Sequence, residues 1–109
     1  MEQKLGTVQV SPAVLATLVR LTAAGVPGVA RVDPPGPAPL RWLPWWRRPT
    51  GVSLQVLADG AHVEVELAVQ QGSNMLEVAA RVQREVGETV EKTAGVPVRE
   101  VNVRIADVL

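Results

Sequence analysis

A tight-turn signal between two alternating segments constrains the fold of this chain more than any other feature. Asp59-Gly60 is a dipeptide typical of hairpin turns. Apolar residues alternate with mostly polar ones in the segments on both sides of it, 52–58 and 62–70. Successive side chains of a strand point to opposite faces, so this pattern predicts a β-hairpin with one apolar face and one largely polar face. The apolar face requires a second layer of structure to cover it.

Two amphipathic helices are predicted to form that second layer. Ser11 as N-cap and Pro12 at the first helical position begin the first helix, and Gly25 ends it. Asn74 as N-cap and Glu77 three residues later resemble a capping box that begins the second helix. The expected apolar stripes are Val14, Leu18 and Leu21 (with Leu15 beside them) in the first helix, and Met75, Ala79, Val82, Val86 and Val90 in the second.

Both predicted helices end in the same four residues, Ala-Gly-Val-Pro. Gly25 and Gly95 are each expected to take a left-handed conformation after the helix, and the proline then blocks its continuation. The repetition is explained equally well by an old internal duplication and by two independent uses of a common stop signal.

Three further segments are predicted as strands: 5–10, 29–32 and 98–105. The chain of 109 residues is long enough for one compact domain, residues 1–109. We therefore expect an α+β two-layer sandwich, with two helices packed on one face of a 4–5-stranded sheet, in the order β-α-β-(long loop)-β-β-α-β.

The predicted long loop, residues 33–50, differs sharply in composition from the rest of the chain. It contains six of the nine prolines and all three tryptophans, while Phe and Tyr are absent from the protein. Long connections of this kind are usually functional or disordered. The tryptophans either fold back onto the core or form an exposed contact. Trp and Arg are typical of interface hot spots and Trp of the membrane–water boundary, and the candidate contact residues are Arg41, Trp42, Trp45, Trp46, Arg47 and Arg48.

Composition argues against most kinds of chemistry. There is no cysteine, and the formal net charge is zero. The single histidine, His62, is expected in solvent on the polar side of its strand. Glu64 and Glu66 share that side, and we expect them to pair with basic residues of neighbouring strands rather than to act as a catalytic carboxylate pair. We predict no catalytic residue, no cofactor, no metal and no small-molecule substrate.

Nucleic-acid binding is kept as the alternative function. The segment 25–28, Gly-Val-Pro-Gly, formally matches the GXXG loop of KH domains. In KH domains that loop joins two helices and leaves its amides free for phosphates, whereas here a proline removes one amide and no basic residue lies within the loop. The chain also has no basic stripe, so nucleic-acid binding is not expected by this route.

The N-terminus lacks the apolar run of a secretory signal, and no stretch approaches the roughly 20 apolar residues that span a bilayer. We expect a cytoplasmic protein, and a peripheral position at the inner face of the cell membrane is kept as an alternative.

Three long stretches resemble the alkaline-shock-protein family of bacterial envelope stress response proteins. They are GTVQVSPAVLATLVRLTAAGVPGV (6–29), VEVELAVQQGSNMLEVAARVQREVGETVEKTAG (63–95) and VREVNVRI (98–105). The resemblance implies a non-enzymatic, self-associating cytoplasmic protein that is held at the membrane through a membrane-anchored partner. Two features depart from the family pattern: Gln71, where an aromatic residue is common, and the loop 33–50. We therefore interpret the loop as a docking surface, for a membrane-anchored partner first and for lipid second.

Overall fold

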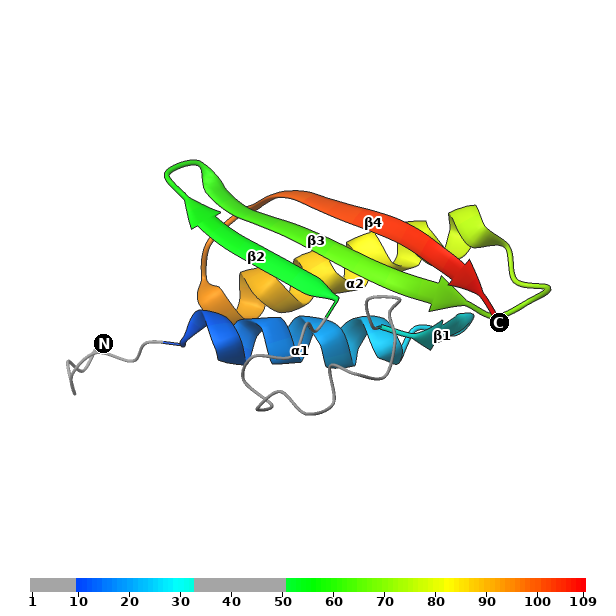
Figure 1. The fold of residues 1–109 in the computed structure, drawn as a ribbon. Coiled ribbons are helices and arrows are strands. Elements are labelled where there is room, and N and C mark those ends of the chain that lie inside the picture. Colours follow the sequence, from blue (N-terminus) through cyan, green and yellow to red (C-terminus); the bar gives the residue numbers. More distant parts are fainter. Residues whose placement is uncertain (1–9, 33–50) are drawn as a thin grey trace, which may run out of the picture.

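The computed structural model describes residues 10–32 and 51–109 as two helices and four strands (Figure 1). The predicted α+β sandwich is confirmed, because both helices lie against the same face of the sheet (Figure 1). The strand predicted at 5–10, except for its last residue, and the loop 33–50 lie outside the described residues. In chain order the elements are α1 (Pro12–Ala24), β1 (Val29–Arg31), β2 (Val52–Leu57), β3 (Gly60–Val69), α2 (Met75–Ala94) and β4 (Val98–Val108).

Strand β3 is the centre of the sheet. One of its edges pairs antiparallel with β2 along its first half and with β1 at its end, where Val29 lies opposite Val69. The other edge pairs with β4 in the parallel direction. Parallel strands need a long crossover, and α2 supplies it by passing over the helical face of the sheet.

The predicted hairpin is present, but its turn lies one residue earlier than expected. Leu57 pairs with Gly60, so Ala58 and Asp59 form the turn and Gly60 is already the first residue of β3. Gly60 has a φ of +133°, and a Cβ atom there would collide with the Pro97 carbonyl. The turn therefore lies directly against the connection between α2 and β4.

The core lies between the sheet and the two helices. Alternate residues of β3 face the helices and are almost completely buried, as the period of a strand requires. Side chains that the structure describes as buried are all apolar. The core cluster consists of Val19, Ala23, Val26, Val29, Val32, Ala61, Val63, Val65, Leu67, Val69, Val78, Val82, Val86 and Val90.

The apolar face predicted for α1 is wrong. Val14 and Leu21 remain 50% and 57% exposed, whereas Leu15, Val19 and Ala23 are buried. This helix is apolar along two adjacent stripes, so periodicity alone did not decide between them. Packing against α2 and the sheet buries the stripe of Leu15, Val19 and Ala23, which ends in a small side chain. Val14 and Leu21, on the other stripe, stay at the surface.

The predicted beginning of α2 is confirmed, since the Asn74 side chain accepts a hydrogen bond from the Glu77 amide (3.2 Å). Val78 replaces Met75 at the start of the buried stripe, and Met75 is 48% exposed.

The two helix ends differ despite their identical sequences. Gly95 is left-handed as predicted, with a φ of 70°. Gly25 is not left-handed, because its φ is −80°, and the first positive φ after α1 is at Gly28.

Candidate functional site

The face of the sheet that the helices leave uncovered carries polar side chains. Glu66 on β3 and Arg104 on β4 lie 3.5 Å apart, which confirms the predicted pairing of Glu66 with a basic residue of a neighbouring strand. Glu64 lies opposite Ser53 and Asn102 in the strand register. A shallow hollow of about 390 Å³ lies over these strands, and its lining includes Gly51, Ser53, Glu64, Glu66, Asn102 and Arg104.

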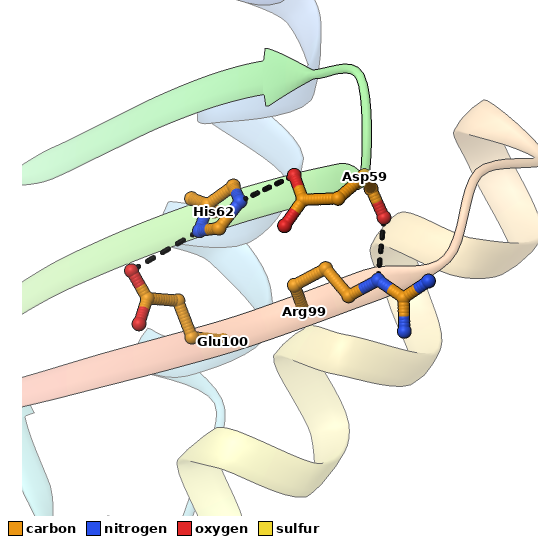
Figure 2. Close-up of polar contacts among 4 residues, drawn as sticks. All are labelled: Asp59, His62, Arg99 and Glu100. Carbon is orange, nitrogen blue, oxygen red and sulfur yellow. Dashed lines mark hydrogen bonds and ion pairs between the residues drawn. The ribbon is translucent and has the colours of Figure 1, made fainter.

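A cluster of charged side chains joins the hairpin turn to β4 at one end of the same face. His62 lies between two carboxylates, with Nε2 at 2.9 Å from Asp59 Oδ1 and Nδ1 at 3.1 Å from Glu100 Oε1 (Figure 2). Arg99 donates from Nε to the Asp59 backbone carbonyl (Figure 2). His62 was expected in solvent on the polar side of its strand; it does lie on that side, but its side chain is only 22% exposed and both ring nitrogens have carboxylate partners, so the expected solvent position is wrong.

This arrangement favours the doubly protonated imidazole. A carboxylate only accepts hydrogen bonds, so both ring nitrogens must donate. The hydrogen bonds to Asp59 and then Glu100 accordingly raise the pKa of His62 above its ordinary value. The hydrogen bond from His62 likewise lowers the pKa of Asp59. The cluster is thus a polar tie between the turn and β4 that favours the protonated form of the histidine.

This cluster could not be predicted from the sequence, because its members come from two distant segments of the chain, 59–62 and 99–100. The spacing of Asp59 and His62 across a turn is a weak local signal. Glu100 lies 38 residues beyond His62 and reaches it only through the parallel pairing of β3 with β4.

The candidate contact residues of the loop, Arg41, Trp42, Trp45, Trp46, Arg47 and Arg48, lie outside the described residues. The two points where the loop joins the domain are described. Arg31 of β1 lies opposite Ala68, and Val52 of β2 lies opposite Val65, so both ends meet the same edge of β3. The Glu66 amide donates to the Gly51 carbonyl (2.7 Å) and fixes the returning end beside the hollow.

Strand β4 has β3 as its strand partner within the described part of the chain, which leaves its other edge open. Hydrogen bonds show which residues of β3 face β4. Ala61 donates to the Pro97 carbonyl and Val69 accepts from the Leu109 amide, whereas Glu66 and Gln70 donate in the opposite direction, to Gly51 and Gly28. Odd-numbered residues of β3 therefore bond toward β4.

The backbone direction of β4 follows from this pattern and from the strand register. Glu100, Asn102 and Arg104 lie opposite even-numbered residues of β3 and direct their amides and carbonyls toward it. Val101, Val103 and Ile105 consequently direct theirs to the open edge. Side chains of α2 reach part of this edge: Gln83 Nε2 donates to the Val101 carbonyl (3.1 Å), and Glu91 accepts from the Val98 amide (3.3 Å).

Other candidate sites are weaker. The segment 25–28 joins α1 to β1, so it does not connect two helices as the loop of a KH domain does. In the described ranges, His, Asp and Glu residues form no group of three that is suited to a metal ion. Neither α1 nor α2 is a candidate membrane-spanning helix.

Comparison with solved structures finds the same fold in several forms of a domain named MamM CTD. A copper form of a single-substitution variant is 12% identical, and the match covers 89% of this chain and 98% of that one, with a TM-score of 0.53. A triple-substitution form is 15% identical and covers 87% and 93%, with a TM-score of 0.52. At this level of identity the likeness shows the fold alone.

Comparison with curated proteins finds no match. A family model matches residues 1–109, the whole of the sequence, and it is the model of the alkaline shock protein 23 family, which has a cell envelope-related function. The match agrees with the stretches in α1, β3, α2 and β4 that carried the resemblance in the sequence. The chain therefore belongs to the alkaline shock protein 23 family and has a cell envelope-related function.

Proposed function

We propose that this protein is a non-enzymatic scaffold of the cell envelope that associates with copies of itself. The observation that carries the proposal is the outer edge of β4, an 11-residue strand that pairs only with β3 among the described residues and directs backbone groups away from the sheet. Such an edge is a template for pairing with another strand unless it is blocked. The described side chains also favour contact over catalysis, because the buried ones are all apolar and several of the charged ones form ion pairs at the surface.

Self-association is tested by sedimentation velocity and light scattering at micromolar concentrations of the full chain. We expect the mean mass to rise with concentration above that of the 11.6 kDa monomer. A strict monomer across the whole range would contradict the scaffold function.

The second part of the proposal is that the loop 33–50 docks the scaffold in the cytoplasm, at the inner face of the membrane. Its contact residues are Arg41, Trp42, Trp45, Trp46, Arg47 and Arg48, and the target is a membrane-anchored protein partner or the lipid surface. Basic side chains near an anionic leaflet gain roughly 1 kcal/mol each, so three arginines alone give weak and reversible binding. Self-association multiplies the contacts and makes the docking effective through avidity.

Replacing Trp45 and Trp46 with Ala tests the docking surface. Exposed residues contribute little to stability, so we expect an almost unchanged melting temperature. We also expect binding to native membrane fractions to fall by more than about tenfold, because one hot-spot tryptophan can contribute roughly 2 kcal/mol. Co-sedimentation with protease-treated membranes, beside untreated ones, separates a protein partner from lipid. If the double variant melts far below the wild type, the tryptophans are part of the core and the docking proposal is wrong.

A further inference from the structure

We propose that β4 pairs antiparallel with β4 of a second copy. The two-fold axis passes midway between Asn102 of one copy and Asn102 of the other, and we call this the axis through Asn102. This inference rests on the proposed self-association and names the surface, the partner and the strand register. In the resulting dimer the two sheets join edge to edge into one continuous sheet, and both layers of helices remain on the same side.

The register is limited by two irregularities in β4. Its pairing with β3 shifts between Val98 and Glu100, and again between Ile105 and Asp107. Only the stretch between these shifts is a regular strand that presents a straight edge. An antiparallel pair that keeps like faces together must be centred on a residue. Within the regular stretch 100–105, an axis at Asn102 uses residues 100–104 symmetrically and an axis at Val103 uses residues 101–105, so the bulges leave these two registers and the side chains decide between them.

The backbone groups at the open edge fit this register. Val101 lies opposite the partner's Val103, and both residues direct their amide and carbonyl outward. Two such residues exchange both hydrogen bonds when they are opposite each other in an antiparallel ladder. The Val101 carbonyl already accepts from Gln83 Nε2, but a carbonyl has a second lone pair, and the Gln83 amide lies in the exposed part of α2 and can turn away.

Side-chain charge is complementary in the same register. Glu100 lies opposite the partner's Arg104, and the two-fold axis repeats the pair with the roles exchanged. Opposite charges that face each other across two strands stabilise their pairing. Both side chains are available, since Glu100 is 52% exposed and Arg104 is 81% exposed. His62 and Glu66 already orient them on the polar face at 3.1 and 3.5 Å.

The helical side of the same strand gains apolar contacts. Val101 and Val103 are partly buried against the core in the single chain, and the pair places each beside the other valine of the partner.

Neighbouring registers lose the charge pairs. An axis through Val103 places Glu100 opposite the partner's Ala106, and an axis through Val101 places it opposite the partner's Asn102. Asn102 itself meets the partner's Asn102 at the axis, where two amides can bond to each other.

Charge reversal tests the inference by sedimentation velocity on the full chain. Glu100→Arg alone places arginine opposite arginine at both repeats of the pair, and Arg104→Glu alone places glutamate opposite glutamate. We expect each single variant to weaken association by about tenfold. An equimolar mixture of the two variants restores both attractive pairs in a heterodimer, and the double variant restores them in a homodimer, so both should return toward wild-type association. Arg20→Glu on the exposed surface of α1 is the matched control and should associate as the wild type does.

The outcomes separate this inference from the function on which it rests. A wild-type protein that never associates contradicts both. If the wild type associates and the two single variants do so equally well, the scaffold function stands and β4 is not the interface. If the single variants dissociate but the mixture stays dissociated, the register is wrong and the inference is overturned. Melting curves of every variant show that a loss of association is not a loss of folding, and the recovery in the mixture is an effect that misfolding does not produce.

Discussion

Replacing Gly28 with Ala is the sharpest test of how α1, β1 and α2 fit together. Gly28 has a φ of +95°, and a Cβ atom there would lie 2.6 Å from Val78 Cγ2 and 3.2 Å from Ser73 Oγ. Two costs therefore add. A left-handed backbone costs a residue with a Cβ atom about 1–2 kcal/mol, and overpacking against a core side chain costs about 1–3 kcal/mol more. We expect Gly28→Ala to lower the free energy of unfolding by about 2–5 kcal/mol.

Gly72→Ala is the matched control, because Gly72 has a φ of +90° and a Cβ atom there would meet nothing within 4 Å. It carries the backbone cost alone, about 1–2 kcal/mol. Urea denaturation followed by far-UV circular dichroism gives both losses, and an unchanged slope with urea shows that the compactness of neither end state has changed. Equal losses for the two variants would refute the reasoning, since they would mean that Gly28 does not pack against Val78.

Two further predictions concern α2 and the charged cluster. Gly87 lies inside α2 where a Cβ atom meets nothing within 4 Å, so Gly87→Ala should raise the free energy of unfolding by about 0.5–1 kcal/mol, and a lower midpoint in urea would contradict this. The raised pKa of His62 means that its tie to Asp59 and Glu100 is fully present below the ordinary histidine pKa of about 6.5 and is lost as pH rises through the folded-state value. The lowered pKa of Asp59 means that the stabilisation from its carboxylate is lost only as pH falls below about 3.9 toward the folded-state pKa. The wild type should therefore exceed His62→Gln in free energy of unfolding most between about pH 4 and 6, and this difference should shrink above about pH 7. A difference that is flat from pH 5 to 9 would show that the histidine is not a cation in the fold.

Local rules predicted the elements that depend on neighbouring residues. The Ser11 and Asn74 caps place both helix beginnings correctly, because a cap is a hydrogen bond between residues three apart. The alternation around Asp59 placed the hairpin, since a one-residue shift would turn every apolar side chain of β3 to the polar face. The turn was predicted one residue too late. A glycine is needed at position 60 because a Cβ atom there would collide with the Pro97 carbonyl, and Pro97 is distant in the sequence.

Features that depend on contacts between distant segments could not be predicted from the sequence. Two apolar stripes of α1 satisfy the same helical period, and only packing against α2 and the sheet buries Val19 rather than Leu21. The contact of His62 with Glu100 could not be predicted, because Glu100 comes close to His62 only through the parallel pairing of β3 and β4.

The sequence by itself determined the class of the fold, because periodicity, caps and turn residues are encoded within a few positions of each other. It also determined the family, through the resemblance carried by the stretches 6–29, 63–95 and 98–105. The tertiary structure alone decided that β4 has an edge without a strand partner among the described residues, and which charged side chains lie along that edge. The bulges in β4, the direction of its backbone groups and the alignment of Glu100 with His62 and of Arg104 with Glu66 follow from its pairing with β3. Strand partners and their register are set by the burial of both faces of a sheet together, and no single segment carries that information.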